Sequence, residues 1–132
     1  MTGPIFLTLD EVLAIHASRI ERYGGGLGIR DVGLLQSALG MPEARFGGQY
    51  LHGSIEEMAA AYLFHIAQNH PFLDGNKRAA LGAAIAFLGM NGFWLEAPDE
   101  DLVELVLRTA QGKATKADIA VFLKEHLRPL PG

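Results

Sequence analysis

Apolar residues recur with a helical period over most of this 132-residue chain. A capping box formed by Thr8 and Glu11 precedes the first such series and predicts a helix from about Leu9 to Tyr23. The glycine-rich run Gly24–Gly28 ends this helix and makes a flexible connection. Asp31 can then cap a short second helix. Local signals therefore place two helices in the first third of the chain.

The middle of the chain predicts a loop followed by a longer helix. Residues 43–53 contain three glycines with Phe46 and Tyr50 between them, which indicates a loop or short hairpin with exposed aromatic side chains. Ser54 and Glu57 form a second capping box ahead of the third helix. That helix ends near residue 69, because the residue before a proline avoids the helical region.

The remaining boundaries follow from the same kinds of signal. A fourth helix starts at Asn76 or Lys77 and stops at Asn91-Gly92, and a short extended piece, Phe93-Trp94-Leu95, follows with Trp94 in the core. A fifth helix opens at Pro98 and ends near Gly112. A last helix is capped by Thr115 and Asp118 and stopped by Pro129. The fourth helix is rich in alanine and glycine, which favours close packing on several sides. The pattern predicts an all-α, compact domain of six helices over residues 1–132, without a repeat or a second domain.

Composition narrows the function classes. Hydrophobic residues make up 49% of the chain and charged residues 20%, as is typical of an ordered globular protein. The net charge of −4, without a run of Lys or Arg, disfavours direct nucleic-acid binding. The lack of cysteine excludes disulfides, thiolate zinc sites and cysteine nucleophiles. No apolar run has membrane-spanning length, and residues 1–10 do not resemble a signal peptide, so a cytoplasmic protein is expected.

The nine residues His70–Arg78 combine a base, a carboxylate, an amide and two cations around one glycine. The turn 74–76 leads into a helix, so it supplies free backbone N–H groups and the positive end of the helix dipole. Lys77 and Arg78 add side-chain cations beside those N–H groups. The simpler interpretation is that residues 74–76 form an ordinary turn without a function. Two cations at a helix N-terminus argue against it, because their charge opposes the helix dipole. The stretch therefore predicts a phosphate-binding site.

The other residues of this stretch suggest a reaction. Asp74 offers a hard oxygen ligand suited to Mg²⁺, which usually arrives bound to substrate phosphates. His70, at the far end of the loop, can accept a proton from an attacking hydroxyl. Phe72 is expected to point inward and anchor the loop. Together they indicate transfer of a phosphorus-containing group from a nucleotide to a hydroxyl.

The stretch His70–Arg78 resembles the signature loop of the Fic superfamily, His-Pro-Phe-x-Asp/Glu-Gly-Asn-Gly-Arg-x-x-Arg. Two positions depart from it, because Lys77 replaces a glycine and Leu81 replaces the second arginine. The Asn-Lys-Arg ending is similar to the death-on-curing (Doc) branch of the superfamily, as is the segment Gly28–Leu39. The resemblance covers about residues 5 to 127.

The resemblance implies a toxin of a bacterial type II toxin–antitoxin pair. Most Fic proteins transfer AMP to a hydroxyl, whereas Doc proteins are kinases that move the γ-phosphate of ATP to a threonine of elongation factor Tu and block translation. By position, the resemblance implies a general base, an Mg²⁺-binding carboxylate, an anion cradle and a target-docking flap over residues 43–53. The residues are His70 for the base, Asp74 for the carboxylate, Gly75, Asn76, Lys77 and Arg78 for the cradle, and Tyr50 and Leu51 for the flap contacts.

The two departures favour a kinase over an AMP transferase. A side chain at position 77 narrows the space for the diphosphate, and the loss of an arginine at position 81 removes one clamp. An AMP transferase, and a catalytically inactive module that binds an antitoxin, remain as alternatives. The chain lacks the inhibitory Ser/Thr-x-x-x-Glu-Gly/Asn segment of many Fic proteins. The resemblance therefore implies a separate Phd-like antitoxin, whose tail folds as a helix in an apolar groove.

Overall fold

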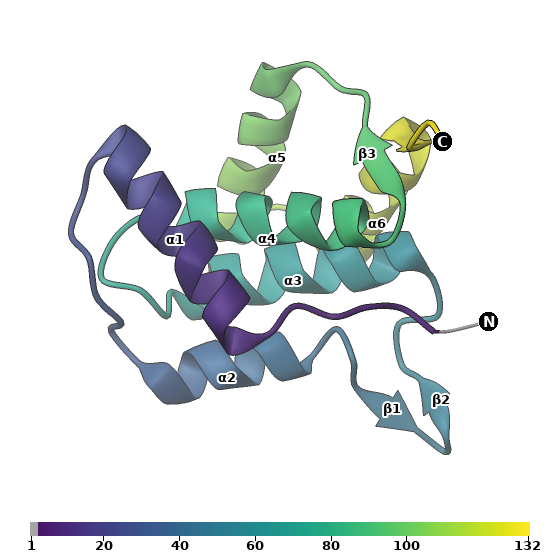
Figure 1. Cartoon of the computed structure of the whole chain (residues 1–132), viewed down its shortest axis with the longest axis horizontal. Helices are drawn as coiled ribbons and strands as arrows, with labels where there is room; N and C mark the ends of the chain where they lie inside the picture. Colours follow the sequence, from purple (N-terminus) through teal and green to yellow (C-terminus); the bar gives the residue numbers. More distant parts are fainter. Residues whose placement is uncertain (1–2) are drawn as a thin grey trace.

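The computed structural model describes residues 3–132, which form six helices and two small antiparallel sheets (Figure 1). In chain order the elements are α1 Leu9–Tyr23, α2 Val32–Gly40, β1 Arg45–Phe46, β2 Gln49–Tyr50, α3 Ile55–Asn69, α4 Asn76–Met90, β3 Phe93–Leu95, α5 Asp99–Ala110, α6 Lys116–His126 and β4 Leu127–Pro129. The predicted all-α fold, with a short hairpin before the third helix, is confirmed. None of the helices in this part of the chain is long and apolar enough to cross a membrane.

Side-chain caps fix where the helices begin. Complete capping boxes at Thr8 and Thr115 start α1 and α6, and the carboxylate of Asp31 caps α2. Only half of the box predicted at α3 forms. The Ser54 hydroxyl accepts from the backbone N–H of Glu57 at 3.2 Å, and it donates to the Glu57 carboxylate at 2.8 Å. The Glu57 carboxylate therefore binds the capping hydroxyl rather than a backbone N–H.

Helices α3 and α4 form the centre of the molecule. Helix α3 packs against α2, α4, α5 and α6, and α4 packs against α1, α3, α5 and β3. The buried face of α4 carries small residues: Ala79, Ala80, Gly82, Ala83 and Ala84. Small side chains let the neighbouring helices approach closely, so the predicted packing of this helix on several sides is confirmed.

Two expectations for the C-terminal third are wrong. Helix α6 ends at His126, before Pro129 is reached, because β4 pairs antiparallel with β3. Trp94 is 42% exposed rather than in the core. Successive side chains of a strand face opposite sides, and Phe93 and Leu95 take the side that packs on the core.

The hairpin β1–β2 differs from expectation in one aromatic residue. Phe46 is exposed, as predicted. Tyr50 is half-buried, because its ring packs on the ring of Phe6 at 5.7 Å and under the guanidinium of Arg45 at 4.2 Å. The expectation that both aromatic side chains are exposed is therefore wrong for Tyr50.

Candidate active site

The loop from His70 to Gly75 joins the C-terminal end of α3 to the N-terminal end of α4. Phe72 points inward, as predicted, and only 1% of it is exposed. Its ring stacks on the imidazole of the buried residue His16 in α1, with ring centroids 3.8 Å apart and planes 5° apart. The side chain of Phe72 therefore fastens the loop to α1.

Backbone atoms of the loop are held by the segment that precedes α2. The guanidinium of Arg30 donates to the carbonyl oxygens of His70 and Asn69, at 2.7 Å and 2.9 Å. The N–H of Leu73 donates to the carbonyl oxygen of Gly28 at 3.1 Å. The two Arg30 bonds satisfy carbonyl groups that the end of α3 leaves free. All three bonds fix the path of the loop.

Two side chains brace the other half of the loop. His16 donates from Nε2 to the carbonyl oxygen of Asp74 at 2.7 Å. Asn76 bonds the backbone of Phe72 twice, accepting from its N–H at 2.9 Å and donating to its carbonyl oxygen at 3.0 Å. The side chain of Asn76 thus shapes the loop, while its backbone N–H stays available to a ligand. Sequence reasoning did not single out His16, because a histidine on the apolar face of a helix carries no distinctive signal.

His70 lies where the chain leaves α3. It is the one non-glycine residue between positions 3 and 132 with a positive φ, at 47°. This left-handed conformation at the helix end costs a side-chain-bearing residue roughly 1 kcal/mol. The imidazole is exposed and has no hydrogen-bond partner among the described residues. It is therefore free to accept a proton from an incoming hydroxyl.

The N-terminal end of α4 has the properties of an anion site. Gly75 is its N-cap with a φ of 74°, and no side chain caps the helix. The backbone N–H groups of Asn76, Lys77 and Arg78 have no acceptor within residues 3–132. A Cβ at position 75 would lie 3.0 Å from the side chain of Ile20, so glycine suits both the conformation and the space. Unpaired N–H groups and the helix dipole together attract an anion.

Two cations flank these N–H groups. Lys77 and Arg78 are exposed, and neither has a carboxylate partner, because the one ion pair within residues 3–132 joins Arg128 and Glu96. The guanidinium of Arg78 lies over the ring of Tyr23 at 4.9 Å. Both side chains therefore keep their charge available for phosphate oxygens.

The glycines after α1 hold Asp74. One carboxylate oxygen accepts from the N–H of Gly26 at 3.3 Å, and the other accepts from the N–H of Gly75 at 2.9 Å. A Cβ at Gly25, where φ is +116°, would come within 2.7 Å of the same carboxylate. The run predicted to be only a flexible connection therefore forms a seat for a side chain of the loop.

Asp74 fits a magnesium ion that is bound mainly by its nucleotide. No cluster of three or more metal-ligating side chains occurs within the described residues. A carboxylate that keeps free lone pairs, next to the unpaired N–H groups of α4, suits Mg²⁺, because this ion is commonly held by one or two carboxylates and the substrate phosphates.

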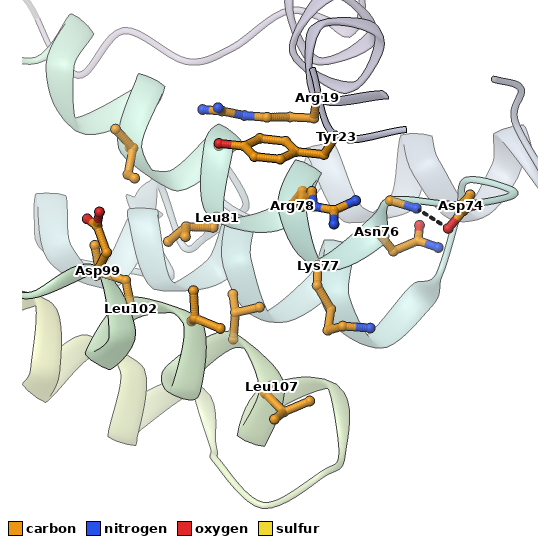
Figure 2. Close-up of a pocket in the computed structure, with 15 residues that line it drawn as sticks. Arg19, Tyr23, Asp74, Asn76, Lys77, Arg78, Leu81, Asp99, Leu102 and Leu107 are labelled. Atoms are coloured by element: carbon orange, nitrogen blue, oxygen red, sulfur yellow. Dashed lines mark hydrogen bonds between the residues drawn. The ribbon is translucent and has the colours of Figure 1, made fainter. Parts of the chain in front are cut away.

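A cavity of about 750 Å³ opens at the start of α4 and continues along this helix, between α1 and α5 (Figure 2). Its polar end includes all five predicted residues from Asp74 to Arg78. The rest of its lining is mostly apolar and consists of Leu81, Ile85, Leu102, Val103, Val106 and Leu107, of which Leu107 lies below Lys77 in Figure 2. The volume lies in the range of sites that hold nucleotide-sized ligands. His70 does not line this cavity and lies at the opposite end of the loop.

The predicted flap lies apart from the loop. The hairpin β1–β2 precedes α3, whereas His70 follows it, so the 15 residues of this helix separate the two by roughly 22 Å (Figure 1). Of the two predicted contact residues, Leu51 is 57% exposed and Tyr50 is half-buried. Target docking at these residues stays a prediction.

Comparisons with known proteins give the same family that the loop His70–Arg78 resembles. Residues 6–88 match the Fic/DOC family. The chain is 34% identical over 116 residues to "Protein kinase doc" of Escherichia phage P1, an alignment that covers 87% of this chain and 90% of that protein. It is 39% identical over 120 residues to "Toxin Doc" of Mycolicibacterium smegmatis, which covers 86% of this chain and 92% of that protein.

Proposed function

This chain belongs to the Fic/DOC family, and on that premise we propose that it is a Doc-type toxin that transfers a phosphorus-containing group from a nucleotide to a protein hydroxyl. One observation carries the chemical part of the proposal. The unpaired N–H groups at the start of α4 lie at the polar end of a nucleotide-sized cavity, beside the unpaired cations Lys77 and Arg78. Such an arrangement stabilises negative charge on a phosphate chain.

Within this class we favour a protein kinase that uses ATP and acts on a threonine of elongation factor Tu. The similarity to a protein named as a kinase supports this choice, as does the exposed side chain of Lys77 at the cradle. An AMP transferase must pass a diphosphate leaving group through the same space, where a glycine would leave more room.

The residues of the loop divide the reaction between them. The threonine oxygen attacks the γ-phosphorus, the bond to the β–γ bridging oxygen breaks, and ADP leaves. His70 takes the proton of the hydroxyl, while the N–H groups of residues 76–78 and the cations Lys77 and Arg78 hold the phosphate oxygens. Asp74 would hold Mg²⁺, which supplies neutralisation of phosphate charge.

The apolar lining of the cavity supports the proposal of an antitoxin partner. Val103 is 59% exposed, Ile85 39% and Leu107 37%, and all three line the cavity. A row of exposed apolar side chains between two helices suits the apolar face of a third helix. We propose that a Phd-like antitoxin folds its tail against this surface.

The reaction is tested with the purified chain, elongation factor Tu and ATP labelled at either the α or the γ phosphate. Label on the target from the γ position alone, and none with His70→Ala, supports the kinase. Label from the α position alone would show an AMP transferase and exclude the kinase.

Expression in growing cells separates an enzyme from an inactive binding module. The proposed enzyme arrests growth as the wild-type chain and permits growth as His70→Ala. Arrest by both chains would show that the toxic effect does not need the base, which favours a module that acts by binding.

A further inference from the structure

Helix α1 places an additional cation in the wall of the cavity. The partly buried side chain of Arg19 extends from α1 above Tyr23 in Figure 2, and it lines the cavity together with Lys77 and Arg78. Within residues 3–132 its guanidinium has neither a hydrogen-bond acceptor nor an ion-pair partner. A guanidinium that is partly withdrawn from water and unpaired retains its donors for a ligand.

The position of this guanidinium is defined by Gly82 of α4. A Cβ at residue 82 would lie 3.3 Å from Nε and 3.7 Å from Nη2 of Arg19, and 2.8 Å from the side chain of Ile15. A side chain at position 82 would thus force Arg19 or Ile15 to move. The glycine allows α1 and its arginine to lie directly on α4.

Arg19 lies where α4 itself has no cation. Positions 78 and 81 are three residues apart, so their side chains share one face of α4. Arg78 occupies the first position, but the second holds Leu81, which also lines the cavity. The guanidinium of Arg19 reaches the adjacent residue, Gly82, from the other helix.

We propose that Arg19 is a nucleotide-binding residue that contacts the phosphate chain of a nucleoside triphosphate. It supplies from α1 the second guanidinium that α4 lacks at position 81. From Lys77 to Gly82 the helix rises by roughly 7.5 Å, a span that a triphosphate with its ribose bridges. Since the inference rests on the proposed function, the experiment has to separate the failure of one from the failure of the other.

Binding of ATP with Mg²⁺ is measured by titration calorimetry on the folded chain and its variants. Arg19→Ala is expected to weaken binding about tenfold or more, the effect of losing a charge-assisted hydrogen bond to phosphate. Arg22→Ala is the matched control, because it removes the same charge from the same helix at an exposed residue that does not line the cavity. Its affinity for ATP should stay within about twofold of wild type.

A rescue variant tests the position of the charge. Arg19→Ala combined with Leu81→Arg returns a guanidinium to the same wall from α4, so it should recover most of the lost affinity. If Arg19→Ala does not fold, as judged by circular dichroism, Arg19→Gln takes its place, since glutamine keeps length and polarity without the charge. A folded Ala or Gln variant that binds ATP within about twofold of wild type would overturn the inference.

The outcomes for the two proposals differ. A wild-type chain that binds ATP and transfers its γ-phosphate, with Arg19→Gln unchanged in affinity, overturns only the role of Arg19. A wild-type chain that binds ATP through Arg19 but labels no target overturns the transfer reaction and leaves the binding role intact. A wild-type chain without affinity for ATP overturns both.

Discussion

The strained residue of the loop is also its proposed base. His70 takes a left-handed conformation because the chain must leave α3 and turn into Pro71, and this conformation disfavours any residue with a Cβ. Its side chain has no partner within the described residues that compensates for the strain. The chain path explains the conformation but not the presence of a side chain there, so the imidazole is better explained by chemistry than by folding.

His70→Gly should therefore separate stability from activity. Glycine adopts a positive φ without strain but loses more entropy on folding, so we expect stability to stay equal or to rise by up to about 1 kcal/mol. Phosphoryl transfer should be lost. Urea denaturation and transfer of label from ATP are the measurements, with His70→Asn as a second variant that tolerates the conformation and lacks the base. A loss of stability by more than about 1 kcal/mol would show that the imidazole has a structural role.

The seat of Asp74 offers a matched pair of substitutions. Gly25→Ala puts a Cβ 2.7 Å from the carboxylate at a φ of +116°, whereas a Cβ at Gly26 meets no atom within 4 Å. We expect Gly25→Ala to lower stability by about 1–3 kcal/mol and to reduce Mg²⁺-dependent transfer. Gly26→Ala should change both much less, since it keeps the N–H that binds Asp74. Equal activity of the two variants would contradict a role for the glycine seat.

At the scale of elements, α1 positions the loop as well as forming a wall of the cavity. His16 both stacks on Phe72 and donates to the carbonyl oxygen of Asp74. His126 in α6 makes a chemically similar pair of contacts, because it stacks on Phe122 at 4.2 Å and bonds the carbonyl oxygen of that residue. The contacts of His16 join α1 to the loop, whereas those of His126 stay within α6.

This similarity gives a controlled test. His16→Leu and His126→Leu each remove one stacked histidine and its bond to a carbonyl group, so each should cost about 1–3 kcal/mol of stability. Only His16→Leu is expected to reduce transfer by tenfold or more at a temperature where both variants are folded. Denaturant midpoints and initial rates of transfer are compared side by side. Similar losses of activity in both variants would mean that the effect comes from stability alone.

The sequence predicts those elements whose signals are local. The caps at Thr8, Asp31 and Thr115 and the proline after residue 70 place the helix ends, and the unusual mixture of residues 70–78 locates the site. Contacts between distant segments escaped prediction. The pairing of β3 with β4, which leaves Trp94 exposed, joins residues more than thirty positions apart. The bonds from α1 and from the glycine run to the loop depend in the same way on how the chain folds back on itself.

At the scale of the whole molecule, the packing of α3 against α6 contains a group of titratable side chains away from the cavity. The ammonium group of Lys116 donates to Nε2 of His65 at 3.0 Å. Burial, followed by the charges of Lys116 and His52, lowers the pKa of His65 from 6.5 to about 4. The pKa of His52, which faces Lys116 and Glu57, is also lowered, chiefly by burial. The folded protein therefore holds both histidines neutral where the unfolded chain would protonate them.

Stability should consequently fall under mild acid. Between pH 6.5 and about 4 the unfolded chain binds a proton at His65 and the native protein does not, so this contribution is complete above pH 6.5 and is lost as the pH falls toward 4. The urea midpoint is measured at pH 7.5, 6.0 and 5.0 for wild type and for His65→Gln. The variant should lose less stability over this range. Parallel profiles for the two proteins would contradict the assignment to His65.

The loop is held mainly by its carbonyl oxygens, and this determines which of its positions can be substituted without loss of the fold. Arg30 and His16 donate hydrogen bonds to the backbone carbonyl oxygens of residues 69, 70 and 74. Every amino acid has such an oxygen. The exposed side chains at positions 73, 77 and 78 take no part in these hydrogen bonds. The residues that hold the loop in place are thus different from the residues at positions 73, 77 and 78, whose side chains face solvent. A library that randomises positions 73, 77 and 78 should therefore yield mostly folded proteins that keep the same loop path and differ in their transfer specificity.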